Sequence, residues 1–243
     1  CARRAGWRSP RSSTGDVVPD YPVNLARKGL THPVPLIIGT NKNEAALFRW
    51  MKSPLMPIKP ESIRAMFAEI AAEQPSLQLP DQTRLGGAYR GGRETIKGLG
   101  LASDLGFRMP SIWFADGHRA VAPVYLYRFD FATAMLRLLR LHAAHATELP
   151  FVWGAISAPC ARTRCSHSVA ARSARRSPNG CAPGGRASRH TVNPRGQAGE
   201  PTWRPYGADD RATMVIDKQD SVVDDLDADV RRAWGGDDVL SFL

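Results

Sequence analysis

Two short segments, far apart in the chain, carry the residues with the clearest chemical potential. Glu44 follows an apolar run and a polar turn, and His145 precedes a second apolar stretch. A carboxylate beside a histidine holds the imidazole in one tautomer and stabilises the imidazolium that forms when the ring accepts a proton. Such a histidine can act first as a general base and then as a general acid. Because acid then histidine is one of the chain orders that hydrolytic triads use, the spacing fits the last two members of a triad.

Each of these residues also has an ordinary structural interpretation. A glutamate in the first turn of a helix interacts favourably with the helix dipole, and Glu44 could do only that. A histidine among Ala and Leu residues is often packed or lies on the surface, which applies to His145 as well. His142, only a few positions earlier, is the alternative base.

A serine nucleophile is the part of such a triad that the sequence does not supply. Gly-x-Ser-x-Gly, the pattern of a nucleophile elbow, occurs nowhere among the 243 residues. Ser103, Ser111 and Ser157 lack the flanking glycines that allow the strained turn to form. We therefore expect this polypeptide by itself to be inactive as a hydrolase of this type.

The elements that would position these residues alternate between strands and helices. The apolar run Val34–Gly39 predicts a strand buried on both faces. Apolar residues at helical spacing predict a helix over Pro60–Glu73, and another is predicted over 101–120, where Pro110 either kinks it or opens its second half. Val124–Phe129 is β-branched and aromatic, so it predicts a further strand. This alternation indicates an α/β fold.

Positive charge and cysteine are concentrated in two unusual segments. Residues 1–14 carry four arginines, residues 157–199 carry eight, and neither segment has an acidic residue. Without those twelve charges the formal net charge of +10 becomes −2, an ordinary balance for an enzyme. All four cysteines lie in the same segments, so they support no conclusion about disulfides. No apolar run is long enough for a membrane span or a signal-peptide core, which favours a cytoplasmic location.

Residues 157–199 admit several interpretations. Their few apolar residues cannot offset roughly 1–2 kcal/mol of backbone entropy per residue, so we expect disorder. The arginines could contact RNA phosphates, although no aromatic residue is present for base stacking. The spacing of a possible zinc set is wider than the Cys-x2-Cys pairs that structural zinc sites favour. Its members would be Cys160, Cys165, His167, Cys181 and His190.

Both chemical segments resemble the type-B carboxylesterase family, which includes the cholinesterases. Residues 39–44 (GTNKNE) are similar to the family's Gly-x-Asn-x-Asp-Glu-Gly segment. Asn43 stands where Asp is usual, and Ala45, the next residue, stands where the last Gly is usual. Residues 145–154 (HATELPFVWG) match the family pattern His-x-x-Glu-Leu-Pro-Phe/Tyr-Val-Phe/Trp-Gly without a gap. The resemblance implies that Glu44 is the triad acid and that His145, rather than His142, is the base.

Further matches extend this resemblance to residues 15–156 and 200–243. Within the helix predicted over 101–120 there is a recurring Asp-x-x-Phe-x-x-Pro signature. A Trp-Pro-x-Tyr-like segment follows late in the chain, and an Asp lead-in stands early in it. The matched positions are Asp16, Asp104, Phe107, Pro110, Ala115, Trp203, Pro205, Tyr206, Arg211 and Met214.

The resemblance implies the C-terminal half of an α/β-hydrolase fold, an incomplete and mostly parallel sheet with flanking helices. The implied activity is hydrolysis of a small-molecule carboxylic ester through an acyl-serine intermediate. The family's first half would supply the nucleophile elbow and the oxyanion donors. No metal or organic cofactor, no nucleic acid and no defined protein partner is implied.

The resemblance also divides the chain. Residues 15–156 and 200–243 form carboxylesterase-like regions, the second with an acidic surface and one helix over 220–238. Residues 1–14 are an unmatched basic leader, expected to be disordered. Residues 157–199 stand where the family has a Trp-x-x-Phe-Ala helix, and their composition suggests a hypothesis of out-of-frame sequence.

Two other classes of function remain open. One is a non-catalytic, cholinesterase-like interaction module, against which the retention of both Glu44 and His145 argues. The other is a basic nucleic-acid-binding protein that uses residues 157–199, whose affinity for RNA would fall steeply with salt.

Overall fold

The computed structural model describes residues 19–53, 56, 59–73, 80, 82–89, 94–152 and 201–235. Residues 1–14 and 157–199 lie outside the described residues. The possible zinc set, the arginines considered for RNA contacts and Asp16 lie outside them too. None of the described helices is long and apolar enough to cross a membrane. The elements are α1 (Pro22–Arg27), β1 (Leu36–Asn41), α2 (Ala45–Trp50), α3 (Pro60–Glu73), α4 (Gln82–Ala88), α5 (Glu94–Ser103), the π-helix η1 (Asp104–Arg108), α6 (Met109–His118), β2 (Val124–Phe129), α7 (Ala134–Leu138), α8 (Leu149–Val152), β3 (Thr213–Ile216), β4 (Ser221–Val223) and α10 (Ala228–Ala233).

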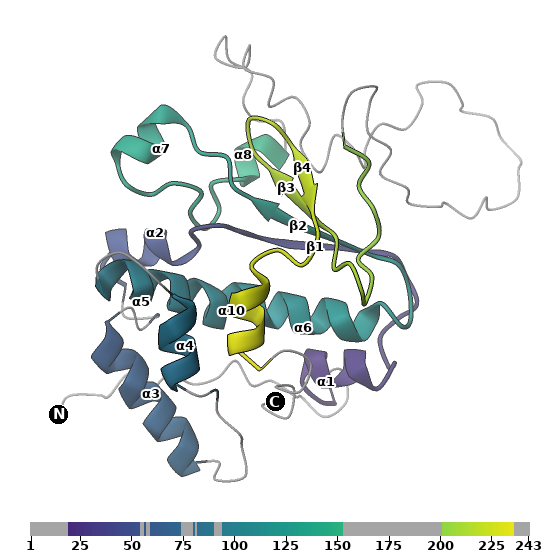
Figure 1. Ribbon diagram of the computed structural model, residues 1–243, viewed down its shortest axis with the longest axis horizontal. Coiled ribbons are helices and arrows are strands. Elements are labelled where there is room, and N and C mark those ends of the chain that lie inside the picture. The colour runs from purple at the N-terminus through teal and green to yellow at the C-terminus, as the bar shows by residue number, and fades with distance from the viewer. Residues whose placement is uncertain are drawn as a thin grey trace, which may run out of the picture.

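A four-stranded sheet in the order β1-β2-β3-β4 forms the centre of the fold (Figure 1). β1, β2 and β3 are parallel, and β4 pairs antiparallel with β3 as a short hairpin. Parallel neighbours require long crossover connections, which here run through helices between β1 and β2. The mostly parallel α/β sheet with flanking helices is therefore confirmed.

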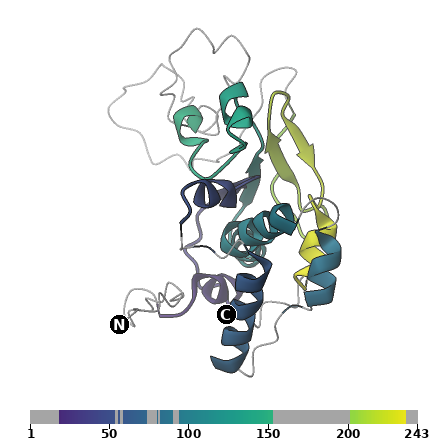
Figure 2. The same ribbon diagram turned by 90° about the vertical axis from the view of Figure 1, so that its left-hand side faces the viewer.

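Helices cover one face of the sheet more thickly than the other. α6 runs beneath the sheet with α1, α3, α4, α5 and α10 on the same side, whereas the short α7 and α8 lie on the opposite side (Figures 1 and 2). Successive side chains of β2 serve both layers: Val124 and Leu126 join the core with α6, and Tyr125 and Phe129 join the core on the other face. β2 is accordingly buried on both faces, and the residues of the next strand, β3, are buried as well.

The prediction for β1 was wrong in its bounds and in its burial. The strand begins at Leu36, not Val34, because its ladder starts where the Leu36 N–H donates to the Pro123 carbonyl (2.9 Å). The preceding Pro35 has no N–H to contribute. Leu36 to Gly39 are only partly buried because β1 lies at the edge of the described sheet.

Pro110 starts a helix instead of kinking one. The helix predicted over 101–120 is built as the end of α5, a five-residue π-helix and then α6, where the proline occupies the first turn. A proline in a helix removes one N–H donor and its ring collides with the carbonyl four residues earlier. The wider π turn over Asp104–Arg108 separates the two α-helices at this point, and such turns are frequent at functional sites.

The acidic closing stretch is only partly a solvated surface. α10 is the predicted helix, but Trp234 directly after it is 1 % exposed and lies in the same core cluster as Phe67 and Tyr89. Its indole Nε1–H donates to the Tyr89 hydroxyl (2.8 Å), which satisfies the buried polar end of the ring. The helix over Pro60–Glu73 is confirmed as α3, with Ile63 and Phe67 buried.

Trp203 anchors the late segment of the chain to the sheet. It is 1 % exposed, its ring contacts Tyr125 and Tyr127 edge-on, and its Nε1–H donates to the Leu126 carbonyl (3.2 Å). We expect Trp203→Ala to lower the free energy of unfolding by about 3–5 kcal/mol, because the cavity cannot be refilled. Trp50→Ala, at a site 61 % exposed, should cost no more than about 0.5 kcal/mol. Urea denaturation followed by circular dichroism compares the two, and equal losses would contradict the assigned packing.

Candidate active site

Glu44 lies where β1 ends and α2 begins. The turn is tied to the end of β2 and to the connection that carries His145: the Lys42 N–H donates to the Phe129 carbonyl, and the Asn43 N–H donates to the Ala143 carbonyl (both 2.9 Å). The carboxylate is 7 % exposed, and its Oε1 accepts the backbone N–H of Asn41 (2.7 Å). This placement fixes the side chain at the carboxyl end of a parallel sheet, where α/β enzymes form their sites.

His145 approaches from the connection between α7 and α8, also beyond the carboxyl end of a strand. Its Nδ1 lies 2.8 Å from Oε2 of Glu44. Because a carboxylate can only accept, this contact places a proton on Nδ1 and leaves Nε2 as the basic nitrogen. The imidazole is 43 % exposed, and Nε2 has no hydrogen bond to any of the described residues.

Two phenylalanines enclose the imidazole, and the sequence did not identify them as part of the site. Phe48 of α2 and Phe107 of the π-helix lie with ring centroids 5.5 and 5.0 Å from that of His145. The two rings also contact each other at 5.9 Å. They cover part of the ring and restrict the rotation of His145. Phe107 had appeared only as part of the helix signature, and Phe48 had no signal beyond its position four residues after Glu44.

The pKa of Glu44 reflects the burial of its carboxylate. Burial raises the pKa of Glu44 above the usual range of a glutamate, while the hydrogen bonds from Asn41 and His145 oppose that rise. The charge of Glu148 adds to the rise. A buried carboxylate with a partner on each oxygen interacts strongly with an imidazolium when one forms, which is what a triad acid must do.

Asn41 connects the two halves of the pair. Besides its N–H to Glu44, its side-chain amide donates to the carbonyl of Ala144, directly before the histidine (2.7 Å), and to the carboxylate of Glu148. Asn41 is 4 % exposed. Packing also explains the glycine of the same motif, because a Cβ at Gly39 would collide with the ring of Tyr127.

The other residues considered for the chemistry lie away from the pair. His142 is exposed, with a positive φ of 53°, and forms no hydrogen bond or ion pair with Glu44. The hydroxyl of Ser103 donates to the Leu99 carbonyl and that of Ser111 to the Phe107 carbonyl (both 2.8 Å), so neither is presented to His145. Ser157 lies outside the described residues. Among the described residues no group of three or more His, Cys, Asp or Glu could hold a metal ion.

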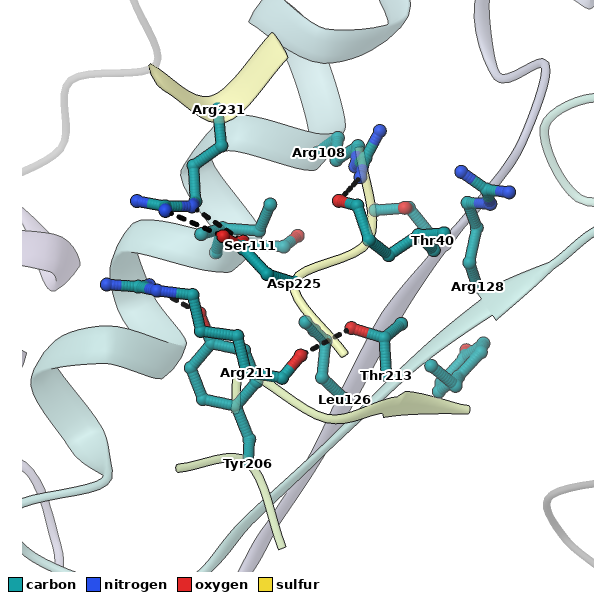
Figure 3. Close-up of a pocket in the computed structure, with 13 residues that line it drawn as sticks. Thr40, Arg108, Ser111, Leu126, Arg128, Tyr206, Arg211, Thr213, Asp225 and Arg231 are labelled. Atoms are coloured by element: carbon teal, nitrogen blue, oxygen red, sulfur yellow. Dashed lines mark hydrogen bonds and ion pairs between the residues drawn. The ribbon is translucent and has the colours of Figure 1, made fainter. Parts of the chain in front are cut away.

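A second cluster of charges lines a pocket on the face of β2 and β3 that packs against α6 (Figure 3). Four arginines meet there, and each is paired with a carboxylate. The pairs are Arg108 with Asp227, Arg128 with Asp130, Arg211 with Asp116, and Arg231 with Asp225. Asp227 also pairs with Arg128, so the contacts of Asp227 and Arg211 tie residues 206–231 to the π-helix, to β2 and to α6.

Asp104 adds a pH dependence to this cluster. Burial raises its pKa to about 6, against the opposing effects of Arg108 and the Tyr89 hydroxyl. Because the folded-state pKa lies above the unfolded value, folding favours the protonated acid, and stability is lost as the pH rises from about 4 to about 6. The loss is at most roughly 3 kcal/mol. We expect Asp104→Asn to remove this part of the pH dependence in urea denaturation between pH 4 and 7. An unchanged profile would contradict it.

The mostly parallel sheet, its flanking helices and the Glu44–His145 pair beyond the strand ends are the framework of an α/β-hydrolase fold. A model of the carboxylesterase family matches residues 8–234. The chain therefore belongs to the carboxylesterase family, as the resemblance of its motifs implied.

Individual relatives match different shares of the chain. The chain is 31 % identical over 156 residues to pyrethroid hydrolase Ces2e of Rattus norvegicus, which is 58 % of this chain and 26 % of the relative. It is 24 % identical over 227 residues to para-nitrobenzyl esterase of Bacillus subtilis, 88 % of this chain and 40 % of that protein. The chain thus spans between a quarter and two fifths of these relatives' length.

Solved structures agree on the fold. A PNB esterase superposes with a TM-score of 0.62 at 21 % identity, over 89 % of this chain and 41 % of the other. The carboxylesterase EST55 of Geobacillus stearothermophilus superposes with a TM-score of 0.58 at 24 % identity, over 90 % and 44 %. At this identity the likeness establishes the α/β-hydrolase fold.

Proposed function

We propose that Glu44 and His145 are the acid and the base of a carboxylic-ester hydrolase whose nucleophilic serine comes from a segment outside these 243 residues. The hydrogen bond between Nδ1 of His145 and Oε2 of Glu44 carries this proposal. Family membership supports it, because the first half of the family supplies the serine and the oxyanion donors. A non-catalytic interaction module would need neither the buried carboxylate nor its alignment with the imidazole.

In this proposal each residue has one task. Nε2 of His145 takes the proton of the serine hydroxyl as the oxygen attacks the ester carbonyl, and returns it to the departing alcohol. Glu44 stabilises the imidazolium between these steps. A water molecule then attacks the acyl-serine, with the same nitrogen as base. Phe48 and Phe107 keep the ring oriented throughout.

The proposal is tested by supplying a nucleophilic serine and its surrounding segment from a relative. The 243-residue chain is fused behind the upstream segment of Bacillus subtilis para-nitrobenzyl esterase, which contains its nucleophile elbow. We expect the fused protein to hydrolyse a short-chain aryl ester and to be labelled by a fluorophosphonate at the elbow serine. The chain alone, with no Gly-x-Ser-x-Gly, should do neither.

Folding of the fused protein is verified separately, by a cooperative thermal transition. A folded fusion that is inactive and unlabelled would contradict the proposal. Hydrolysis by the unfused chain, surviving replacement of His145, would contradict it as well, because the rate would then come from another group.

A further inference from the structure

The start of α2 has an unusual cap. Glu44 occupies the N-cap position, where a side chain ordinarily accepts an N–H of the first turn. Here the Glu44 side chain makes no such cap: its two oxygens accept instead from the Asn41 N–H and from His145. The use of the carboxylate in the acid–base pair therefore leaves the first turn of α2 without its own cap.

A serine from another helix takes over that task. The hydroxyl oxygen of Ser103, at the end of α5, accepts the backbone N–H of Ala45 (3.0 Å). Its own proton is donated to the Leu99 carbonyl (2.8 Å), which turns a lone pair toward α2. Ser103 is 6 % exposed and Ala45 is fully buried, so water cannot replace this bond.

We propose that Ser103 is a positioning residue for the acid of the pair: by capping Ala45 from α5, it leaves the Glu44 carboxylate free to hold His145. The inference rests on the proposed function of the Glu44–His145 pair. Without the hydroxyl, the N–H of Ala45 would be buried and unsatisfied, which costs about 1–3 kcal/mol. The Glu44 carboxylate, from the residue directly before Ala45, would then turn to relieve it at the cost of its bond to His145.

The tautomer of His145 reports this competition directly. While Glu44 accepts from Nδ1, the neutral ring carries its proton on Nδ1. An imidazole that Glu44 no longer holds returns to a mixture of the two tautomers in which the Nε2–H form predominates. The two nitrogens have separate ¹⁵N frequencies that depend on protonation. The whole chain is labelled with ¹⁵N-histidine, and spectra are recorded at about pH 8, where imidazole is neutral. The signals of His145 are assigned by their loss in His145→Asn.

The chain offers a matched control. Ser111 in α6 makes the same hydroxyl bond to the carbonyl four residues earlier, at the same 2.8 Å, but it has no bond to α2. We expect Ser103→Ala to lose the Nδ1–H signals of His145, whereas Ser111→Ala keeps them. Ser103→Thr, which retains the hydroxyl and its bond to the helix carbonyl, should keep them too.

Three results are decisive. Nδ1–H retained in a folded Ser103→Ala chain would overturn the role of Ser103 and leave the acid–base pair intact. Equal loss in Ser103→Ala and Ser111→Ala would also overturn it, because the effect would then be general destabilisation. If the unmodified chain already carries its proton on Nε2, the pair itself fails, and the proposed function fails with it.

Discussion

Replacement of His145 by asparagine should abolish catalysis in the fused enzyme, with kcat lowered on the order of 10⁶-fold. Without a base, the serine hydroxyl keeps its proton during attack, and only the contributions of the oxyanion donors and of substrate binding remain. The proposal assigns this role to His145 and not to the neighbouring His142, because it is the ring of His145 that bonds to Glu44. Initial rates of ester hydrolysis measure the loss.

The neighbouring histidine provides the control for this result. His142 is exposed and adopts a left-handed conformation with φ 53°, which asparagine tolerates better than most residues. His142→Asn should therefore leave kcat within about threefold, since a surface substitution changes stability little. A loss of comparable size in His142→Asn would mean that the base has been assigned to the wrong residue.

Replacement of Glu44 by glutamine should lower kcat on the order of 10⁴-fold, although the shape of the side chain is kept. In the unmodified chain the Asn41 N–H donates to Oε1 of Glu44. In the variant this N–H still requires an acceptor, so the oxygen of the new amide faces Asn41. The amide NH2 is then directed at Nδ1 of His145. Two donors cannot share a bond, so the imidazole must accept at Nδ1 and carry its proton on Nε2. In that tautomer it cannot take the proton of a serine.

Glu148 provides the control substitution for Glu44→Gln. It lies three residues after His145 and accepts from the Asn41 side chain, so it belongs to the same cluster without contacting the imidazole. Glu148→Gln retains an oxygen for that bond, and we expect at most about a tenfold loss of kcat. If the two substitutions cost the same, the acid is not specifically Glu44.

Much of the framework could be predicted from local patterns. α3, the helical region around Pro110 and the β2 strand follow from periodicity, proline and β-branched residues, which act within one element. The two-residue error at β1 arose because an apolar run does not show where pairing begins; that depends on Pro35 and on the register with β2. Likewise the burial of Trp234 depends on a pocket made by Phe67 and Tyr89, far away in the sequence.

The residues of the candidate site also differ in how far the sequence predicts them. Glu44 and His145 could be found because the family motifs contain them. Asn41, Phe48 and Ser103 could not be given their roles, because each acts through contacts that only the folded chain creates: the Asn41 amide with the Ala144 carbonyl, the Phe48 ring with His145, and the Ser103 hydroxyl with the Ala45 N–H. Sequence patterns of this kind identify groups that react and leave out those that hold them in place.

The ¹⁵N spectrum of His145 in the unmodified 243-residue chain tests the central claim most directly, because it needs neither a serine nor a substrate. The account predicts a proton on Nδ1, facing Glu44, and its transfer to Nε2 in Glu44→Gln. A ring that carries its proton on Nε2 in both chains would contradict the account, since Glu44 would then not hold the histidine as a base.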